Sequence, residues 1–159
     1  MNTAIRFASK DDMPKVLNLI KELAHFEREP DAVEVTVEEL IKNGFGENPE
    51  FTCFVAETNN SIEGIALVYK RFSTWKGVTL HLEDLIVSQK MRGRGIGTKL
   101  LDRVILYASE LEVKRVTWEV LDWNTPAIDF YEKKGASIKK EWRVVHLDEN
   151  GIKYYINKL

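Results

Sequence analysis

The spacing of apolar residues in the first part of the chain predicts one strand followed by two helices. Residues 5–7 are typical of a short strand. Apolar positions then recur at helical spacing through residues 13–24, and Ser9 with Asp12 forms a capping box that marks where this helix starts. Residues 38–43, which end before Gly44, indicate a second short helix.

Strands dominate the middle of the chain. Residues 51–57 and 62–71 are expected to form a hairpin, because the polar residues 58–61 between them favour a turn. Residues 79–87 predict a further strand, and residues 96–110 predict a helix with one apolar stripe. Residues 115–121 alternate as another strand.

The last part of the chain predicts a helix and a hairpin. Asn124 followed by Pro126 indicates a helix start, and Gly135 its end. We expect residues 142–147 and 153–156 to pair across the turn signal Asn150-Gly151. The whole series predicts an α/β fold in one domain, residues 1–159, with a central mixed, largely antiparallel sheet and helices on both faces.

Composition narrows the function classes. The 159 residues are 44% hydrophobic and 30% charged, an ordinary globular mixture, and the formal charge of −2 argues against a nucleic-acid-coating protein. No apolar run is long enough to span a bilayer. The single cysteine cannot form an intrachain disulfide and the start of the chain lacks the hydrophobic core of a signal peptide, so a cytoplasmic location is favoured. Cys53 is expected to be a small buried hydrophobe. The three histidines, His25, His81 and His146, lack the spacing of metal ligands. We therefore expect no metal site.

A glycine-rich basic turn between a predicted strand and a predicted helix is the most informative stretch. The first N–H groups of a helix lack intrahelical acceptors and carry the positive end of its dipole, so they attract anions. Gly93, Gly95 and Gly97 allow the backbone to curl and a phosphate to approach, while Arg92 and Arg94 add charge. The spacing is neither that of a Walker loop nor that of a dinucleotide fingerprint.

The pattern Arg92-x-x-Gly95-x-Gly97 resembles the acetyl-CoA pyrophosphate loop of the GNAT N-acetyltransferase superfamily. The run from Asn124 through Tyr131 to Gly135 resembles its second cofactor motif, and scattered agreement elsewhere resembles the spermidine/spermine (diamine) branch. This resemblance covers essentially the whole chain and implies transfer of acetyl from acetyl-CoA to a primary amine. It also implies a homodimer, for which the final hairpin could supply an interface strand.

The resemblance implies a role for each matching residue. Tyr131 would protonate the departing CoA thiolate. The cofactor would be bound by Leu85, Ile86 and Val87, by Arg92, Gly93, Arg94, Gly95, Ile96, Gly97 and Thr98, and by Asn124, Thr125, Pro126, Ala127 and Tyr131. The amine would be bound by Phe26, Glu27, Glu83, Trp118, Glu119, Glu141 and Trp142, since carboxylates and aromatic faces suit a cation.

Glu83 is the expected catalytic base. An alkylammonium must lose a proton before it can attack a thioester, and Glu83 ends a strand just before the phosphate turn. Because adjacent strand residues point to opposite faces, Glu83 is expected to share its face with His81, Leu85 and Val87, and not with Asp84. The alternative without a catalytic role is that Glu83 and Asp84 are solvated or salt-bridged strand residues.

The acceptor itself is open. The loop at residues 72–77 is more similar to the thialysine-acetylating relatives than to the polyamine enzymes, because Thr74 stands where the polyamine type carries an aspartate. Thialysine, lysine-like amines or short diamines are therefore favoured over long polycations. Two other hypotheses remain: a non-catalytic CoA-binding module and a protein lysine acetyltransferase.

Overall fold

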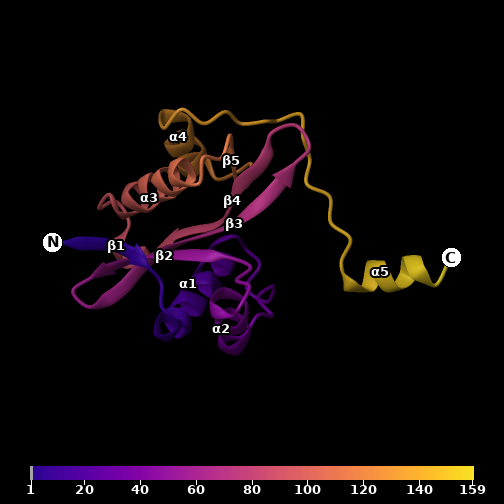
Figure 1. Ribbon diagram of the computed structural model, residues 1–159, viewed down its shortest axis with the longest axis horizontal. Coiled ribbons are helices and arrows are strands. Elements are labelled where there is room, and N and C mark those ends of the chain that lie inside the picture. Colours follow the sequence, from indigo (N-terminus) through magenta and orange to yellow (C-terminus); the bar gives the residue numbers. More distant parts are fainter. Residues whose placement is uncertain (1) are drawn as a thin grey trace. The chain divides into compact units, whose positions relative to one another are not determined.

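The computed structural model describes residues 2–159, and its internal contacts divide the chain into a larger unit ending at Glu119 and a smaller unit, Val120–Leu159. The larger unit holds a five-stranded sheet in the order β1-β2-β3-β4-β5 (Figure 1). The strands are β1 (Thr3–Phe7), β2 (Thr52–Thr58), β3 (Ser61–Ser73), β4 (Gly77–Val87) and β5 (Val116–Thr117). Every pairing is antiparallel except β4 with β5, so the predicted mixed sheet is confirmed.

The helices of the larger unit cover both faces of this sheet. Figure 1 shows α1 and α2 on one face and α3 on the other. They are preceded or joined by two short 3₁₀ helices, η1 and η2. The elements are η1 (Lys10–Asp12), α1 (Met13–Phe26), α2 (Val37–Phe45), η2 (Gln89–Met91) and α3 (Ile96–Glu110).

Local signals explain where these elements begin. The predicted capping box is confirmed, because the backbone N–H of Ser9 donates to Asp12 Oδ2 at 2.7 Å. A second box joins Thr36 and Glu39 at the start of α2. The turn between β2 and β3 places Asn59 and Asn60 at positive φ, which confirms the predicted hairpin.

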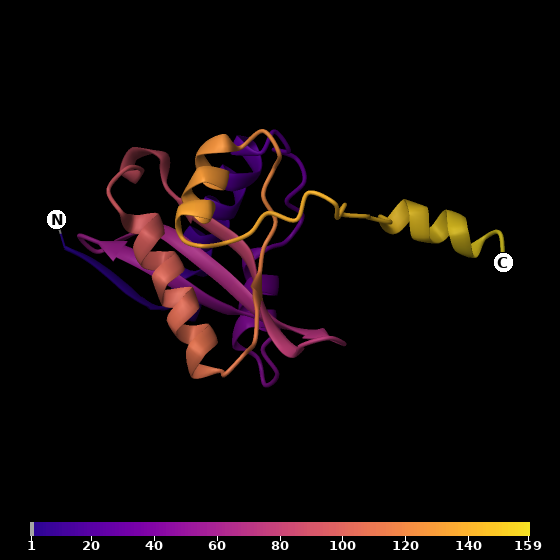
Figure 2. The same cartoon turned by 90° about the horizontal axis from the view of Figure 1, so that it is seen from above.

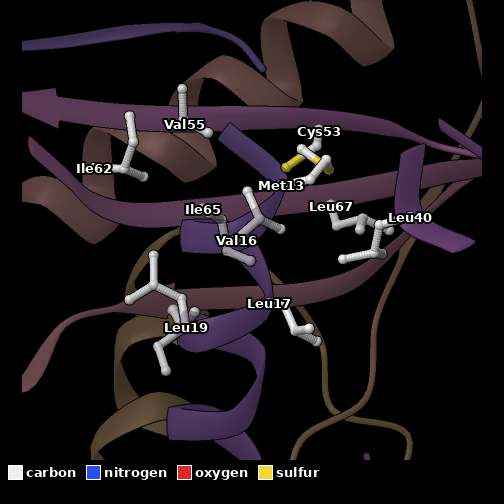
Figure 3. Packing of buried hydrophobic residues seen from close by; sticks show 11 residues of the cluster. Met13, Val16, Leu17, Leu19, Leu40, Cys53, Val55, Ile62, Ile65 and Leu67 are labelled. Carbon is white, nitrogen blue, oxygen red and sulfur yellow. The ribbon is translucent and has the colours of Figure 1, made fainter. Parts of the chain in front are cut away.

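The main core lies between α1, α2 and the sheet. Figure 3 shows Met13 of α1 beside Cys53 and Val16 beside Ile65 of the sheet, and Met13, Val16 and Ile65 are fully buried. On the opposite face α3 packs closely on β3. A Cβ on Gly64 would lie 2.9 Å from Ile86 O and 3.0 Å from Leu100 Cδ1, so glycine leaves room for the close approach of β4 and α3.

The smaller unit confirms one predicted helix. The helix α4 (Thr125–Lys133) starts at Asn124, whose side chain accepts a hydrogen bond from Ala127 N at 3.4 Å. Gly135 has φ +88 and ends it as predicted, with Ala136 N donating to Tyr131 O at 3.1 Å.

Two strand predictions at the end of the chain are wrong. Residues 142–147 are irregular, and residues 153–156 belong to a helix, α5 (Glu149–Ile156), which Figure 2 shows at the end of an irregular segment. Asp148 is the reason: its Oδ1 accepts from Gly151 N at 2.7 Å, which makes it a helix N-cap. The predicted strand 115–121 is also much shorter than expected, since only Val116 and Thr117 pair with β4.

Candidate active site

A β-bulge in β4 brings two carboxylates together. Asp84 pairs with Leu67 of β3, whereas Leu82 pairs with the next residue, Val68, so Glu83 is the extra residue of the bulge. The bulge cancels the strand alternation, and Glu83 and Asp84 both line the same two pockets beside α1. The expectation that they point to opposite faces is therefore wrong.

The bulge also changes which residues share a face with Glu83. His81 does share it, because its Nε2 lies 3.6 Å from Glu83 Oε2. Val87 does not, since its Cγ2 is 3.8 Å from the place a Cβ of Gly97 would occupy, on the α3 side. Leu85 follows the bulge two residues before Val87 and shares Val87's face. The predicted grouping of Glu83 with Leu85 and Val87 is therefore wrong.

Two adjoining pockets lie between β4, α1 and the segment that leads into α2. Their volumes are about 450 Å³ and about 360 Å³, and both are lined by Ile20, Val35, Glu83 and Asp84. The larger is also lined by residues of α2, of β3 and of the segment between α2 and β2: Glu39, Leu40, Asn43, Glu50, Phe51 and Leu67. The smaller adds residues of α1 and the next segment: Leu23, Ala24, Glu27, Ala32, Val33 and Glu34.

Asp84 and Glu27 hold their protons more tightly than exposed carboxylates do. Burial, and then the charges of Glu83 and Glu27, raise the pKa of Asp84 to about 6. Burial also raises the pKa of Glu27. Carboxylates that repel one another in a partly dry pocket gain most from a cation placed among them, so the pocket suits an ammonium group.

Glu83 is supported by Tyr69, which the sequence did not single out, and by His81, which was expected on the same face. The Tyr69 hydroxyl hydrogen-bonds to Glu83, and its ring lies 5.1 Å from that of His81. His81 Nδ1 lies 2.9 Å from Thr117 Oγ1, and burial lowers the pKa of His81, so this imidazole is neutral at pH 7. Tyr69 faces His81 across the strand pair, a relation that only the register reveals.

The glycine turn has the predicted conformation. Gly93 and Gly95 have φ +74 and +78, a region that residues with a Cβ rarely adopt, and Gly95 is the N-cap of α3. The first amides of α3 lack intrahelical acceptors, as at any helix start: Ile96, Gly97 and Thr98. The backbone here therefore fits an anion such as a diphosphate.

Arg92 is anchored within the larger unit. Its Nε donates to Val87 O at 3.0 Å, its Nη2 lies 3.8 Å from Glu22 Oε1, and its guanidinium sits 5.0 Å from the centre of the Phe26 ring. Phe26, expected in the amine site, thus contacts a cation of the chain itself. Arg94 is exposed on the turn.

The end of β4 has one open edge. Within the described residues β5 pairs only with Leu80 and His81, so Leu85, Ile86 and Val87 have no strand partner on that side. Main-chain groups along an unpaired edge can hydrogen-bond an extended ligand.

The other predicted site residues lie in both units. In the larger unit, Trp118 and Glu119 directly follow β5, and the charge of Glu119 acts on Tyr69 and His81. In the smaller unit, Tyr131 is buried with its ring 5.4 Å from that of Phe130. That unit also holds the α4 start, with Asn124, Thr125, Pro126 and Ala127, and the exposed Glu141 and Trp142.

Residues 2–159 show neither a metal-ligand cluster nor a membrane-spanning helix. No group of three or more histidine, cysteine, aspartate or glutamate side chains is arranged to hold a metal ion. None of the helices described there combines the length and apolar character needed to cross a membrane.

A turn whose conformation fits an anion directly follows a strand that carries two neighbouring carboxylates, an arrangement that suits a phosphorylated cosubstrate beside a cationic substrate. Comparison with known families gives the particular class. Residues 13–136 match the acetyltransferase (GNAT) family, and the chain belongs to that family. GNAT acetyltransferases use acetyl-CoA as cosubstrate, and this chain is an N-acetyltransferase.

Two relatives illustrate the branch. A thialysine N-epsilon-acetyltransferase of Bos taurus is 39% identical over 140 residues, which are 83% of this chain and 82% of that protein. The spermidine/spermine N(1)-acetyltransferase-like protein 1 of Homo sapiens is 38% identical over 139 residues. The alignment covers 83% of this chain but only 20% of that longer human protein.

Solved structures show the same fold. An integron cassette protein from the mobile metagenome of V. cholerae superposes with a TM-score of 0.80, covering 98% of each chain at 23% identity. An aminoglycoside acetyltransferase from an uncultured soil metagenomic sample gives a TM-score of 0.73 at 23% identity, covering 91% of this chain and 93% of that one. The predicted acyltransferase fold is therefore confirmed.

Proposed function

We propose that this enzyme transfers acetyl from acetyl-CoA directly to the primary amine of a small cationic acceptor while both are bound. The observation that carries the proposal is the bulge in β4, which places Glu83 and Asp84 in one pocket immediately before the anion-binding turn. The cofactor end and the acceptor end of the site are thus joined by a few residues of one strand.

The turn and the open edge of β4 fit the two halves of coenzyme A. The positive-φ glycines and the first amides of α3 suit its diphosphate, and the main chain at residues 85–87, which has no strand partner on the β5 side, suits the amides of its pantetheine arm. When bound, acetyl-CoA supplies the activated acetyl thioester.

The acid cluster would bind the acceptor as an ammonium ion and then remove its proton. The pocket residues Glu27, Glu83 and Asp84 attract the cation, and Glu83 accepts one proton directly or through water. The freed amine would form a C–N bond with the thioester carbonyl carbon, the C–S bond would break, and the Tyr131 hydroxyl would donate its proton to the leaving sulfur. The nitrogen would then release its second proton to solvent, from which the Tyr131 phenolate regains one. No covalent intermediate on the enzyme is needed.

Thialysine or a lysine-like amine is the proposed acceptor. The Bos taurus relative carries that activity in its name, and an apolar pocket beside the acid pair suits a chain of methylene and thioether groups. Thr74 instead of an acid in the β3–β4 loop leaves less negative charge for the distal amines of a polyamine.

A thiol-release assay with acetyl-CoA and thialysine, lysine, putrescine and spermidine tests the proposal. We expect thialysine to be the best acceptor, and loss of a general base in Glu83→Gln to lower kcat by roughly 10²-fold or more. Glu38→Gln, the same change on the exposed side of α2, is the control. Equal background rates with every amine would refute the proposal.

We further propose that residues 1–159 act as one acetyltransferase domain and as a homodimer. The family match at residues 13–136 runs across both units of the structure, which supports the first point. Analytical ultracentrifugation at micromolar concentration tests the second, and a monomer mass there would contradict it.

A further inference from the structure

A set of contacts ties the glycine turn to helix α1. Glu22 of α1 accepts a hydrogen bond from the backbone N–H of Gln89 at 2.7 Å, at the start of η2. The same oxygen, Oε1, lies 3.8 Å from Arg92 Nη2, at the end of η2. One carboxylate of α1 therefore holds both ends of the short helix that leads into the turn.

Arg92 completes this connection from the other side. Its Nε donates to Val87 O at the end of β4, and its guanidinium stacks 5.0 Å above Phe26, one helical turn after Glu22 on the same face of α1. A planar guanidinium can satisfy a carbonyl, a carboxylate and an aromatic face together, which an ammonium cannot. We call Glu22, Phe26 and Arg92 the α1 latch.

The helix held by the latch also forms the acceptor pocket. Ile20, Leu23 and Ala24 of α1, with its C-cap Glu27, line the pocket that contains Glu83 and Asp84. A shift of α1 relative to the turn would thus change the pocket wall and the anion site at once.

We propose that the α1 latch couples the two binding sites, so that coenzyme A and the amine acceptor each strengthen the binding of the other. This inference rests on the proposed function and adds Glu22 to it as a positioning residue. Each ligand favours the same placement of α1 against the turn, and the second ligand meets a site that the first has already ordered.

Calorimetry of the dead-end complex measures this coupling without turnover. The dissociation constant of CoA is determined alone and with saturating thialysine, and the ratio of the two values is the coupling factor. We expect a factor of about five or more in the wild-type protein, and the same factor when thialysine is titrated with and without CoA. In Glu22→Leu, which removes both contacts of the carboxylate, we expect a factor near one.

The ratio separates coupling from a merely structural role. A variant that is only less stable would weaken both ligands and leave the ratio unchanged. Glu22→Gln keeps an acceptor for Gln89 N–H but loses the charge facing Arg92. Its coupling factor is expected to lie between those of the wild type and Glu22→Leu, and it replaces Glu22→Leu in the test if that variant does not fold. Glu38→Gln is the matched control.

Two outcomes would overturn the inference alone: a wild-type factor of one, or the wild-type factor retained in Glu22→Leu. Both outcomes apply once the wild-type protein has been shown to acetylate thialysine. Absence of amine-dependent thiol release from the wild-type protein would instead refute the proposed function, and the inference with it.

Discussion

The ionised carboxylate of Asp84 is expected to destabilise the folded state at neutral pH. The pKa of its carboxyl is raised from 3.8 to about 6, chiefly by burial and then by Glu83 and Glu27. At about 1.4 kcal/mol per pKa unit, keeping this group ionised costs the folded state about 3 kcal/mol. Asp84→Asn keeps the shape and removes the charge, so the variant should be more stable than the wild type at pH 7.5 by up to about 3 kcal/mol.

The sign of the pH dependence follows from linkage. Below the unfolded pKa of 3.8 the carboxyl is protonated in both states, so the ionisation cost is absent. The cost grows as the pH rises toward 6 and is constant above it. The stability advantage of Asp84→Asn should therefore be largest at pH 7.5 and shrink toward zero near pH 3.5.

Urea unfolding of both proteins at several pH values measures this difference. Asp11→Asn, an exposed aspartate in η1, is the control and should change stability little at any of them. An advantage for Asp84→Asn that is the same at both ends of the range, or a loss of stability at pH 7.5, would refute the account of the acid cluster. The same variant should lower kcat, because the pocket loses a carboxylate.

Three further predictions concern other parts of the molecule. Asp12→Asn should destabilise the protein by about 1–2 kcal/mol at pH 7, because Arg6 holds the pKa of Asp12 at about 2; urea unfolding should show this loss fading as the pH falls from 3.8 toward 2. Gly64→Ala should cost about 1–3 kcal/mol in thermal unfolding, because its Cβ would lie 2.9 Å from Ile86 O; an unchanged Tm would contradict that packing. Tyr131→Phe should lower kcat at least tenfold in stopped assays with little change in CoA affinity, and an equal loss in both would point to packing instead.

Much of the fold is readable from periodicity because its long elements have consistent local signals. The Ser9–Asp12 box, the Asn59-Asn60 turn and the glycine turn before α3 each act through neighbouring residues, and the structure confirms all three. The prediction for the end of the chain is wrong because two local signals compete there. Asn150-Gly151 favours a hairpin, but Asp148 caps a helix at that place, and sequence alone did not rank the two signals.

The acid pair and the α1 latch could not be predicted from the sequence, because both depend on contacts between distant segments. Nothing in the letters Leu-Glu-Asp-Leu at residues 82–85 reveals a bulge, because a bulge depends on the register against β3. Glu22 and Gln89 are 67 positions apart, so no local pattern links them. Arg92 was predicted from the motif as a phosphate residue, whereas its partners in the chain depend on tertiary packing.

The proposed acetyl transfer requires that the turn after β4 bind the diphosphate of coenzyme A through its main chain. Isothermal titration of CoA into the wild-type protein and into Gly95→Ala tests that most directly, because the added Cβ disfavours φ +78. We expect one site per chain in the wild type and at least tenfold weaker binding in the variant. No heat of binding in the wild type, or equal affinity in both proteins, would contradict the account.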